Sequence, residues 1–149
     1  MRHIEYTYTE GMGDDELAER LESHETGVVS LTHDGDAVGL PVAHYYDGES
    51  LYLRLCERPG GSKSAAVAET NRASFVVTGG ATADEAWSVV VRGPLTPVEM
   101  EEVTDTTLNE WFAPVRLFDE AVEDVVPVVY RMEIEDIGGR RSCGPVSTG

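Results

Sequence analysis

The stretch TGVVSLTHDGDAVGLPVAHYYDGESLYLRLC, residues 26–56, decides the fold. Two short turn sequences, DGD at 34–36 and DGE at 47–49, divide it, and sequences of this kind close β-hairpins. In its last part, leucines alternate with tyrosine, arginine and cysteine, which predicts a strand with one buried face. The stretch therefore predicts three consecutive antiparallel strands, at 26–33, 37–46 and 50–56.

The rest of the chain adds further strands and short helices. Segments of alternating or β-branched residues predict strands at 74–80, 87–92 and 128–135. Helices are expected at 14–24, 62–71 and 96–112. For the third helix, Thr96 and Glu99 have capping-box spacing, Pro97 suits the first helical position, and Ala113-Pro114 ends it. Asp14 or Asp15 is expected to cap the first helix, and residues from 137 onward are expected to form a loop.

Six strands in short hairpin steps, with helices too small to cover a parallel sheet, predict a mainly β protein. We expect a closed, six-stranded antiparallel barrel with short helices packed outside it. An open antiparallel sheet covered on one face by the helices is the alternative that the pattern leaves open. The 149 residues suit one domain spanning 1–149. No apolar run approaches the roughly 18 residues of a spanning helix. No signal-peptide pattern opens the chain, so a cytoplasmic protein is expected.

The charge balance is strongly acidic: 28 acidic and 11 basic side chains give a formal net charge of −17. Such a charge repels nucleic-acid phosphates and anionic membranes, and no basic stripe offsets it. Acidic residues are spread along all polar segments, and Lys63 is the single lysine. This pattern is typical of a salt-adapted protein, whose self-repulsion is screened in molar salt because the Debye length falls to about 3 Å. Its stability is therefore expected to rise with salt.

The segment PGGSK, residues 59–63, is the clearest candidate binding motif. Glycines let a ligand approach the backbone, a helix start presents unpaired N–H groups, and Lys63 adds a full positive charge. The spacing is not that of a Walker A loop, and a plain turn before a helix is the simpler alternative. Because surface lysine is otherwise absent, the motif favours a phosphate-binding role for Lys63 and its neighbour Ser62.

Other reactive residue types give weaker indications. Cys56 and Cys143 lack a C-x-x-C spacing and are interpreted as free thiols. The histidines have no spacing that suggests a shared metal, so no metal site is expected. His44 lies on a predicted strand, where a structural role competes with proton donation or stacking. Trp87 and Trp111 are candidates to cover a bound ring, although aromatic residues on apolar faces usually belong to the core.

Over about half of its length, residues 27–98, the chain resembles the pyridoxamine 5'-phosphate oxidase-related flavoproteins of the FMN-binding split-barrel fold. The ordered segments GVVSLTHDGDAVGLPVAHYYDGESLYLRL, GGSKSAAVAETNRASFVV and WSVVVRGPLTPV carry this resemblance. It implies a homodimer with FMN in a groove between the subunits, and an oxidoreductase that transfers hydride or electrons to or from a small organic substrate. Carried over by position, the implied cofactor-binding residues are Pro41, Val42, Arg54, Leu55, Ser62, Lys63 and Ser88.

The chain also departs from the oxidase pattern. Near Pro41 it lacks the arginine, and near Ser88 the glutamine, of the oxidase proper, so phosphate neutralisation would fall on Lys63 with Arg54 or Arg58. The tail does not reproduce the family's basic substrate motif, which argues against pyridoxamine phosphate as the substrate. The chain looks nearer to the branch that includes nitroimidazole-reductase-like proteins. Two alternatives stay open: a deazaflavin-coenzyme-dependent reductase of the same fold, and a non-catalytic dimeric module that binds flavin or haem.

Overall fold

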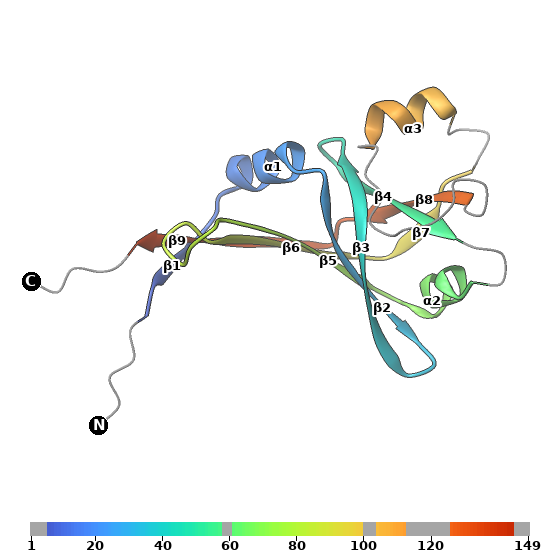
Figure 1. The fold of residues 1–149 in the computed structure, drawn as a ribbon, viewed down its shortest axis with the longest axis horizontal. Coiled ribbons are helices and arrows are strands. Elements are labelled where there is room, and N and C mark those ends of the chain that lie inside the picture. Colours follow the sequence, from blue (N-terminus) through green and yellow to red (C-terminus); the bar gives the residue numbers. More distant parts are fainter. Residues whose placement is uncertain (1–5, 58–60, 100–103, 113–125, 145–149) are drawn as a thin grey trace, which may run out of the picture.

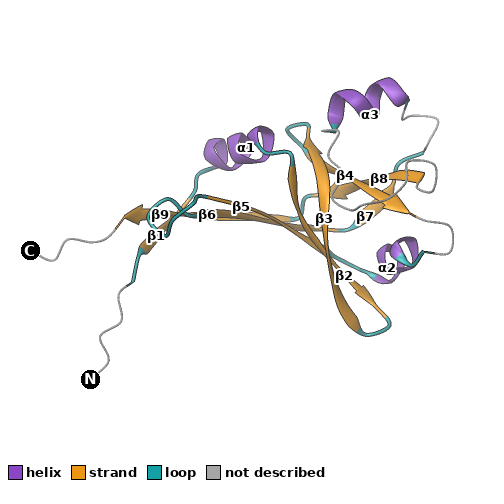
Figure 2. Cartoon of the chain, in the orientation of Figure 1, coloured by secondary structure: helices purple, strands orange, loops and turns teal. Residues whose placement is uncertain are grey.

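The computed structural model describes residues 6–57, 61–99, 104–112 and 126–144. Within these residues the chain forms nine strands and three short helices (Figures 1 and 2). The strands are β1 (Tyr8–Gly11), β2 (Thr26–His33), β3 (Asp36–Tyr46), β4 (Ser50–Glu57), β5 (Ala73–Gly79), β6 (Trp87–Gly93), β7 (Leu95–Pro97), β8 (Val126–Glu133) and β9 (Asp136–Gly144). The helices are α1 (Asp14–Ser23), α2 (Lys63–Glu69) and α3 (Asp105–Trp111).

The strands form one antiparallel sheet in the order β1-β9-β6-β5-β2-β3-β4-β8-β7. The sheet curls back on itself because β6 continues through Pro94 directly into β7. β6 pairs with β5 and β9, whereas β7 pairs with β8 at the other end of the strand order. Two backbone hydrogen bonds seal this closure, from Glu133 N–H to the carbonyl of Pro94 at 3.2 Å and from Glu135 N–H to that of Arg92 at 3.0 Å. The mainly β, antiparallel split-barrel fold that the resemblance implied is confirmed, although β1, β7 and β9 were not among the six predicted strands. β7 continues β6 as one bent strand, and β1 and β9 extend the sheet beyond the barrel (Figure 1).

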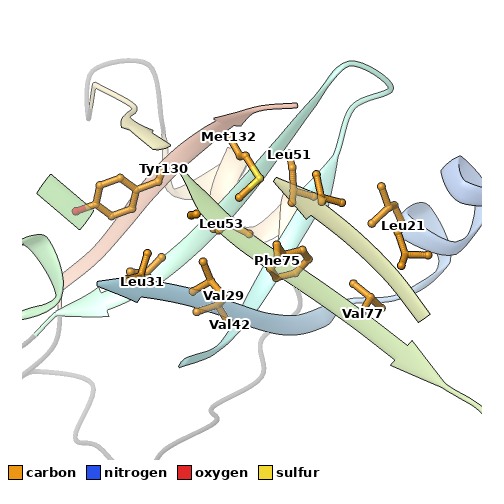
Figure 3. Close-up of a cluster of buried hydrophobic side chains, with 14 of the residues drawn as sticks. Leu21, Val29, Leu31, Val42, Leu51, Leu53, Phe75, Val77, Tyr130 and Met132 are labelled. Atoms are coloured by element: carbon orange, nitrogen blue, oxygen red, sulfur yellow. The ribbon is translucent and has the colours of Figure 1, made fainter. Parts of the chain in front are cut away.

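The core lies inside the curled sheet, where alternate residues of each strand meet (Figure 3). Phe75 of β5 and the leucines of β4 are almost completely buried there, as the alternation in the sequence predicted. Leu17 and Leu21 of α1 join this core beside β3 and β6, while Ala66 and Val67 of α2 join it beside β2 and β4. The two helices therefore cover different parts of the barrel core. The side of the sheet that faces away from this core is here called the outer face, and the strand residues that alternate with the core residues point to it.

The predicted helix over 96–112 is wrong at its start and confirmed at Asp105–Trp111. Leu95–Pro97 form β7, because this short segment continues β6 and pairs with β8. The described helix is α3, and its N-cap is Thr104, whose Oγ1 accepts a hydrogen bond from Thr107 N–H at 3.1 Å. Residues 100–103 and the expected helix stop at Ala113-Pro114 lie outside the described residues, as do Arg58, Pro59 and Gly60.

The tail was also predicted wrongly, since residues 136–144 form β9 and not a loop. The adjacent residues Gly138 and Gly139 are typical of a loop, so the sequence did not indicate a strand here. β9 nevertheless pairs with β1 on one side and β6 on the other, and these strands provide hydrogen-bond partners for its backbone. The helix predicted at 14–24 is confirmed as α1, although Gly13 and not an aspartate is its N-cap. None of the helices in the described ranges has the length and apolar character needed to cross a bilayer.

Candidate functional site

Two cationic side chains lie at the end of β4: Arg54 on its outer face and Lys63 at its backbone. Arg54 and Cys56 point to this face while Leu53 and Leu55 point into the core. The ammonium Nζ of Lys63, the first residue of α2, donates a hydrogen bond to the carbonyl oxygen of Cys56. The guanidinium of Arg54, two residues before Cys56, lies over the ring of Phe112 at 5.7 Å from the centroid. The fold thus brings together two of the predicted phosphate-binding residues from a strand and a helix.

The start of α2 has an acidic neighbour that the sequence reasoning missed. The carboxylate of Glu57 accepts hydrogen bonds from Ser64 N–H, at 3.0 Å, and from the Ser64 hydroxyl. Ser62 occupies the N-cap position and is exposed, but its own side chain makes no capping hydrogen bond. Glu57 therefore caps this helix in place of Ser62, and it sets a negative charge beside Lys63. No short-range spacing in the sequence signals this contact between residues seven positions apart.

The other predicted cofactor-binding residues lie in three different environments. Pro41 is exposed on the outer face of β3, two residues before Ala43, which pairs with Arg54. The side chains of Val42 and Leu55 are buried in the barrel core, so only their backbone atoms are available to a ligand on the outer face. Ser88 is half-buried on β6, between Thr78 of β5 and Arg140 of β9.

Ser88 lies on a strand that is well separated from β4 in the strand order. β5, β2 and β3 lie between β6 and β4 in the sheet. At about 4.8 Å per strand, this separates Ser88 from β4 by roughly 19 Å along the sheet.

An aromatic cluster covers the outer face beside Arg54. The ring of Trp111 stacks on that of Tyr45, with centroids 4.9 Å apart and planes inclined by 7°, and contacts the ring of Tyr52 at 4.8 Å. Tyr45 and Tyr52 are paired across the β3–β4 hairpin, and α3 supplies Trp111 and Phe112. Burial, followed by the negative charge of Asp47, raises the pKa of Tyr52 above its ordinary value. The cluster offers flat, half-buried rings next to Arg54.

The side chains of His44 and Trp87 are buried, where both have structural roles. His44 is buried, its Nε2 lies 2.9 Å from the carbonyl oxygen of Leu21, and its ring meets Phe75 edge-on. Burial lowers the pKa of His44 below its ordinary value, so the neutral ring that donates from Nε2 is favoured. Trp87 is buried in the core, under Arg20 and His24 of the α1 segment.

The sequence profile of the family described as pyridoxamine 5'-phosphate oxidase matches residues 13–141. No curated protein matches the chain. Among solved structures, a FAD-binding protein from Mesorhizobium loti is 20% identical, with a TM-score of 0.65 over 92% of this chain and 98% of that one. The FAD and haem binding protein of Mycobacterium smegmatis is 17% identical, with a TM-score of 0.64 over 94% and 76% of the two chains. A suggested 5-nitroimidazole antibiotic resistance protein from Bacteroides thetaiotaomicron is 17% identical, with a TM-score of 0.65 over 95% of each chain. At these identities the likeness establishes a shared fold.

Proposed function

The chain belongs to the pyridoxamine 5'-phosphate oxidase family, and from this premise we propose that it binds FMN and acts as an oxidoreductase on a small organic substrate. The observation that carries the proposal is that two cations meet the same end of β4 in an otherwise acidic molecule: Arg54 points from this strand, and Lys63 donates to the carbonyl of Cys56 two residues later. Flavin-binding proteins among the similar structures support it. A bound flavin supplies hydride or electron transfer, which protein side chains cannot perform.

The described residues fit an anionic, planar cofactor. Lys63 and Arg54 neutralise a phosphate, and the exposed hydroxyl of Ser62 is available as a further donor. The flat rings of Tyr45 and Trp111 lie on the same side of the sheet and offer an apolar surface beside these charges. Glu57 opposes the binding of a phosphate, because its carboxylate lies where an anion would approach the start of α2. Its charge is therefore expected to weaken phosphate binding and to favour a ligand that both cations hold.

A second part of the proposal is that the active unit is a homodimer whose cofactor lies between the copies. The outer face of β2, β3, β5 and β6 supports it, because none of the outward-pointing residues of these four strands is an aspartate or glutamate. Outward valines and a proline form a row across the four strands through consecutive pairs: Pro41, Val28, Val76 and Val90. Two molecules of net charge −17 can approach closely only where such acid-free, partly apolar surfaces meet. Ser88 of one copy and Lys63 of the other could then contribute to one site.

Flavin binding by Lys63→Ala tests the cofactor proposal. Losing a charge-assisted hydrogen bond of about 1.5–3 kcal/mol weakens FMN binding by roughly 10- to 150-fold, while the fold is retained. Arg72→Ala is the matched control, because it removes the same charge from an exposed ion pair with Glu135 and should leave FMN binding unchanged. The readout is flavin fluorescence during titration of the unliganded protein in molar potassium chloride.

Three outcomes would contradict parts of this proposal. If Lys63→Ala binds FMN as tightly as the unchanged chain, the phosphate site lies elsewhere. If the protein takes up a deazaflavin coenzyme or haem and not FMN, the cofactor is wrong. If bound FMN is neither reduced by nicotinamide donors nor reoxidised by small organic acceptors, the protein is a flavin-binding module without redox activity.

A further inference from the structure

A second cluster of ligand-bearing side chains lies at the opposite end of α2 from Lys63. It consists of His33, the last residue of β2, Asp34 in the following turn, and Glu69, the last residue of α2. One potential ligand atom from each of the three lies within 4.8 Å of the other two. The cluster is separate from the proposed flavin site, because α2 begins at that site and ends here.

The backbone holds these residues together. Asp34 N–H donates to a carboxylate oxygen of Glu69 at 2.8 Å, and Thr32 N–H donates to the hydroxyl of Thr70 at 2.9 Å. The tip of the β2–β3 hairpin is therefore docked on the end of α2. This docking fixes His33 and Glu69 relative to each other. Asp34 Oδ2 lies 3.5 Å from Nε2, the other ring nitrogen of His33, so the Asp34 side chain, which is 81% exposed, must rotate toward Nδ1 to share an ion with Glu69.

The imidazole of His33 provides the observation that points to a cation. Its Nδ1 is buried and makes no hydrogen bond within the described part of the chain, although a carboxylate oxygen of Glu69 lies 3.4 Å away. Two ligands bound to one tetrahedral ion at 2.0–2.1 Å are separated by about 3.4 Å. The distance from His33 Nδ1 to Glu69 Oε1 is long for a hydrogen bond and matches the separation of two ligands on one tetrahedral ion.

We propose that His33, Asp34 and Glu69 form a site for a divalent transition metal of the Zn²⁺ type. One imidazole nitrogen and two carboxylate oxygens suit zinc, cobalt or manganese, whereas calcium and magnesium prefer sites made only of oxygen. Three protein ligands leave a fourth position for water. Because the ligands come from the hairpin and from α2, the bound ion ties these two elements together and stabilises the fold.

Calorimetric titration of Zn²⁺ into metal-stripped protein tests this proposal. The titration is done in molar potassium chloride, which suppresses diffuse counter-ion binding to the acidic surface. We expect one ion per chain and a higher melting temperature with zinc. His33→Gln and Glu69→Gln should each weaken binding at least tenfold. Glu135→Gln is the matched control, since it removes one exposed carboxylate from a different ion pair and should leave binding unchanged.

Two further measurements distinguish lost metal binding from lost folding, and a specific site from adventitious binding. The melting temperatures of the variants in chelator show whether they fold, so that lost binding is separated from lost structure. Co²⁺ in the same site should give the visible absorption of four-coordinate cobalt, and this absorption should disappear in His33→Gln. Zinc binding that is unchanged in His33→Gln, or that involves several ions and vanishes in molar salt, would mean adventitious binding only and would overturn the proposal.

Discussion

Gly93 stands where β6 bends into β7 and the sheet closes, and its replacement by alanine tests this closure. An added Cβ would lie 1.7 Å from the carbonyl oxygen of Glu133 and 2.8 Å from its carbonyl carbon. These are backbone atoms, so a side-chain rotation cannot relieve the overlap, and β8 must move away from the bend. That movement weakens the hydrogen bonds from Glu133 N–H to Pro94 and from Glu135 N–H to Arg92.

Two weakened hydrogen bonds cost about 0.5–1.5 kcal/mol each, and overpacking adds roughly 1–3 kcal/mol. Gly93→Ala is therefore expected to lower the free energy of unfolding by about 2–6 kcal/mol. For a domain of this size the melting temperature falls by about 4–24 °C. The assay is urea unfolding followed by tryptophan fluorescence and circular dichroism at a fixed, high salt concentration.

The matched control is Gly138→Ala in β9. Its added Cβ would meet no atom within 4 Å, so the change should leave stability unchanged or raise it slightly. If Gly93→Ala and Gly138→Ala prove equally stable, the backbones do not cross at Gly93 as described, and the closure of the barrel through β6 and β7 is wrong.

Two further predictions concern the core and the acid-free outer face. Burial makes the pKa of His44 lower in the folded protein than in the unfolded chain, where it is about 6.5. The neutral imidazole therefore contributes its full stability above about pH 6.5, and this contribution is lost as the pH falls from there toward the folded-state pKa. The slope of unfolding free energy between about pH 7.5 and 5.5 should therefore be shallower in His44→Gln, and an identical slope would contradict this assignment. Val28→Asp sets a carboxylate into the exposed apolar row, where Val28 is 42% exposed, and should convert a dimer into a monomer in light scattering. Glu22→Asp, an exposed carboxylate exchange on α1, is its control, and a Val28→Asp protein that stays dimeric would exclude this face as the interface.

The strands of residues 26–56 could be predicted because each carries its own alternation of core and outward residues. β7 and β9 could not, since neither segment carries such an alternation. Leu95–Pro97 resemble the start of a helix, and Gly138 and Gly139 resemble a loop. In both segments, pairing on the sheet overrides local propensity.

The residues of the candidate site likewise include some that the sequence could predict and some contacts that it could not. Ser62 and Lys63 were recognisable because adjacent residues form the motif. Tyr45 and Tyr52 could have been found from the hairpin register, since the short turn between β3 and β4 sets them opposite each other. Trp111 was named as a candidate to cover a bound ring, but its stacking on Tyr45 could not be predicted, because the packing of α3 on the outer face leaves no periodic signal in the strands that it covers.

The acidic composition makes surfaces without acidic residues easier to recognise as candidate binding surfaces. When acidic residues outnumber basic ones by 28 to 11, an acid-free strand face or a half-buried lysine departs from the background more than it would in a neutral protein. Each carboxylate near a binding surface adds repulsion toward an anionic ligand or toward a second copy, so surfaces that need either should lose their acidic residues first. Glu57 is the exception, since it lies beside Lys63 and caps α2. Its retention follows if the helix start needs a cap that the exposed Ser62 does not supply, and the weaker phosphate binding that results must then be offset by Arg54 and Lys63 together.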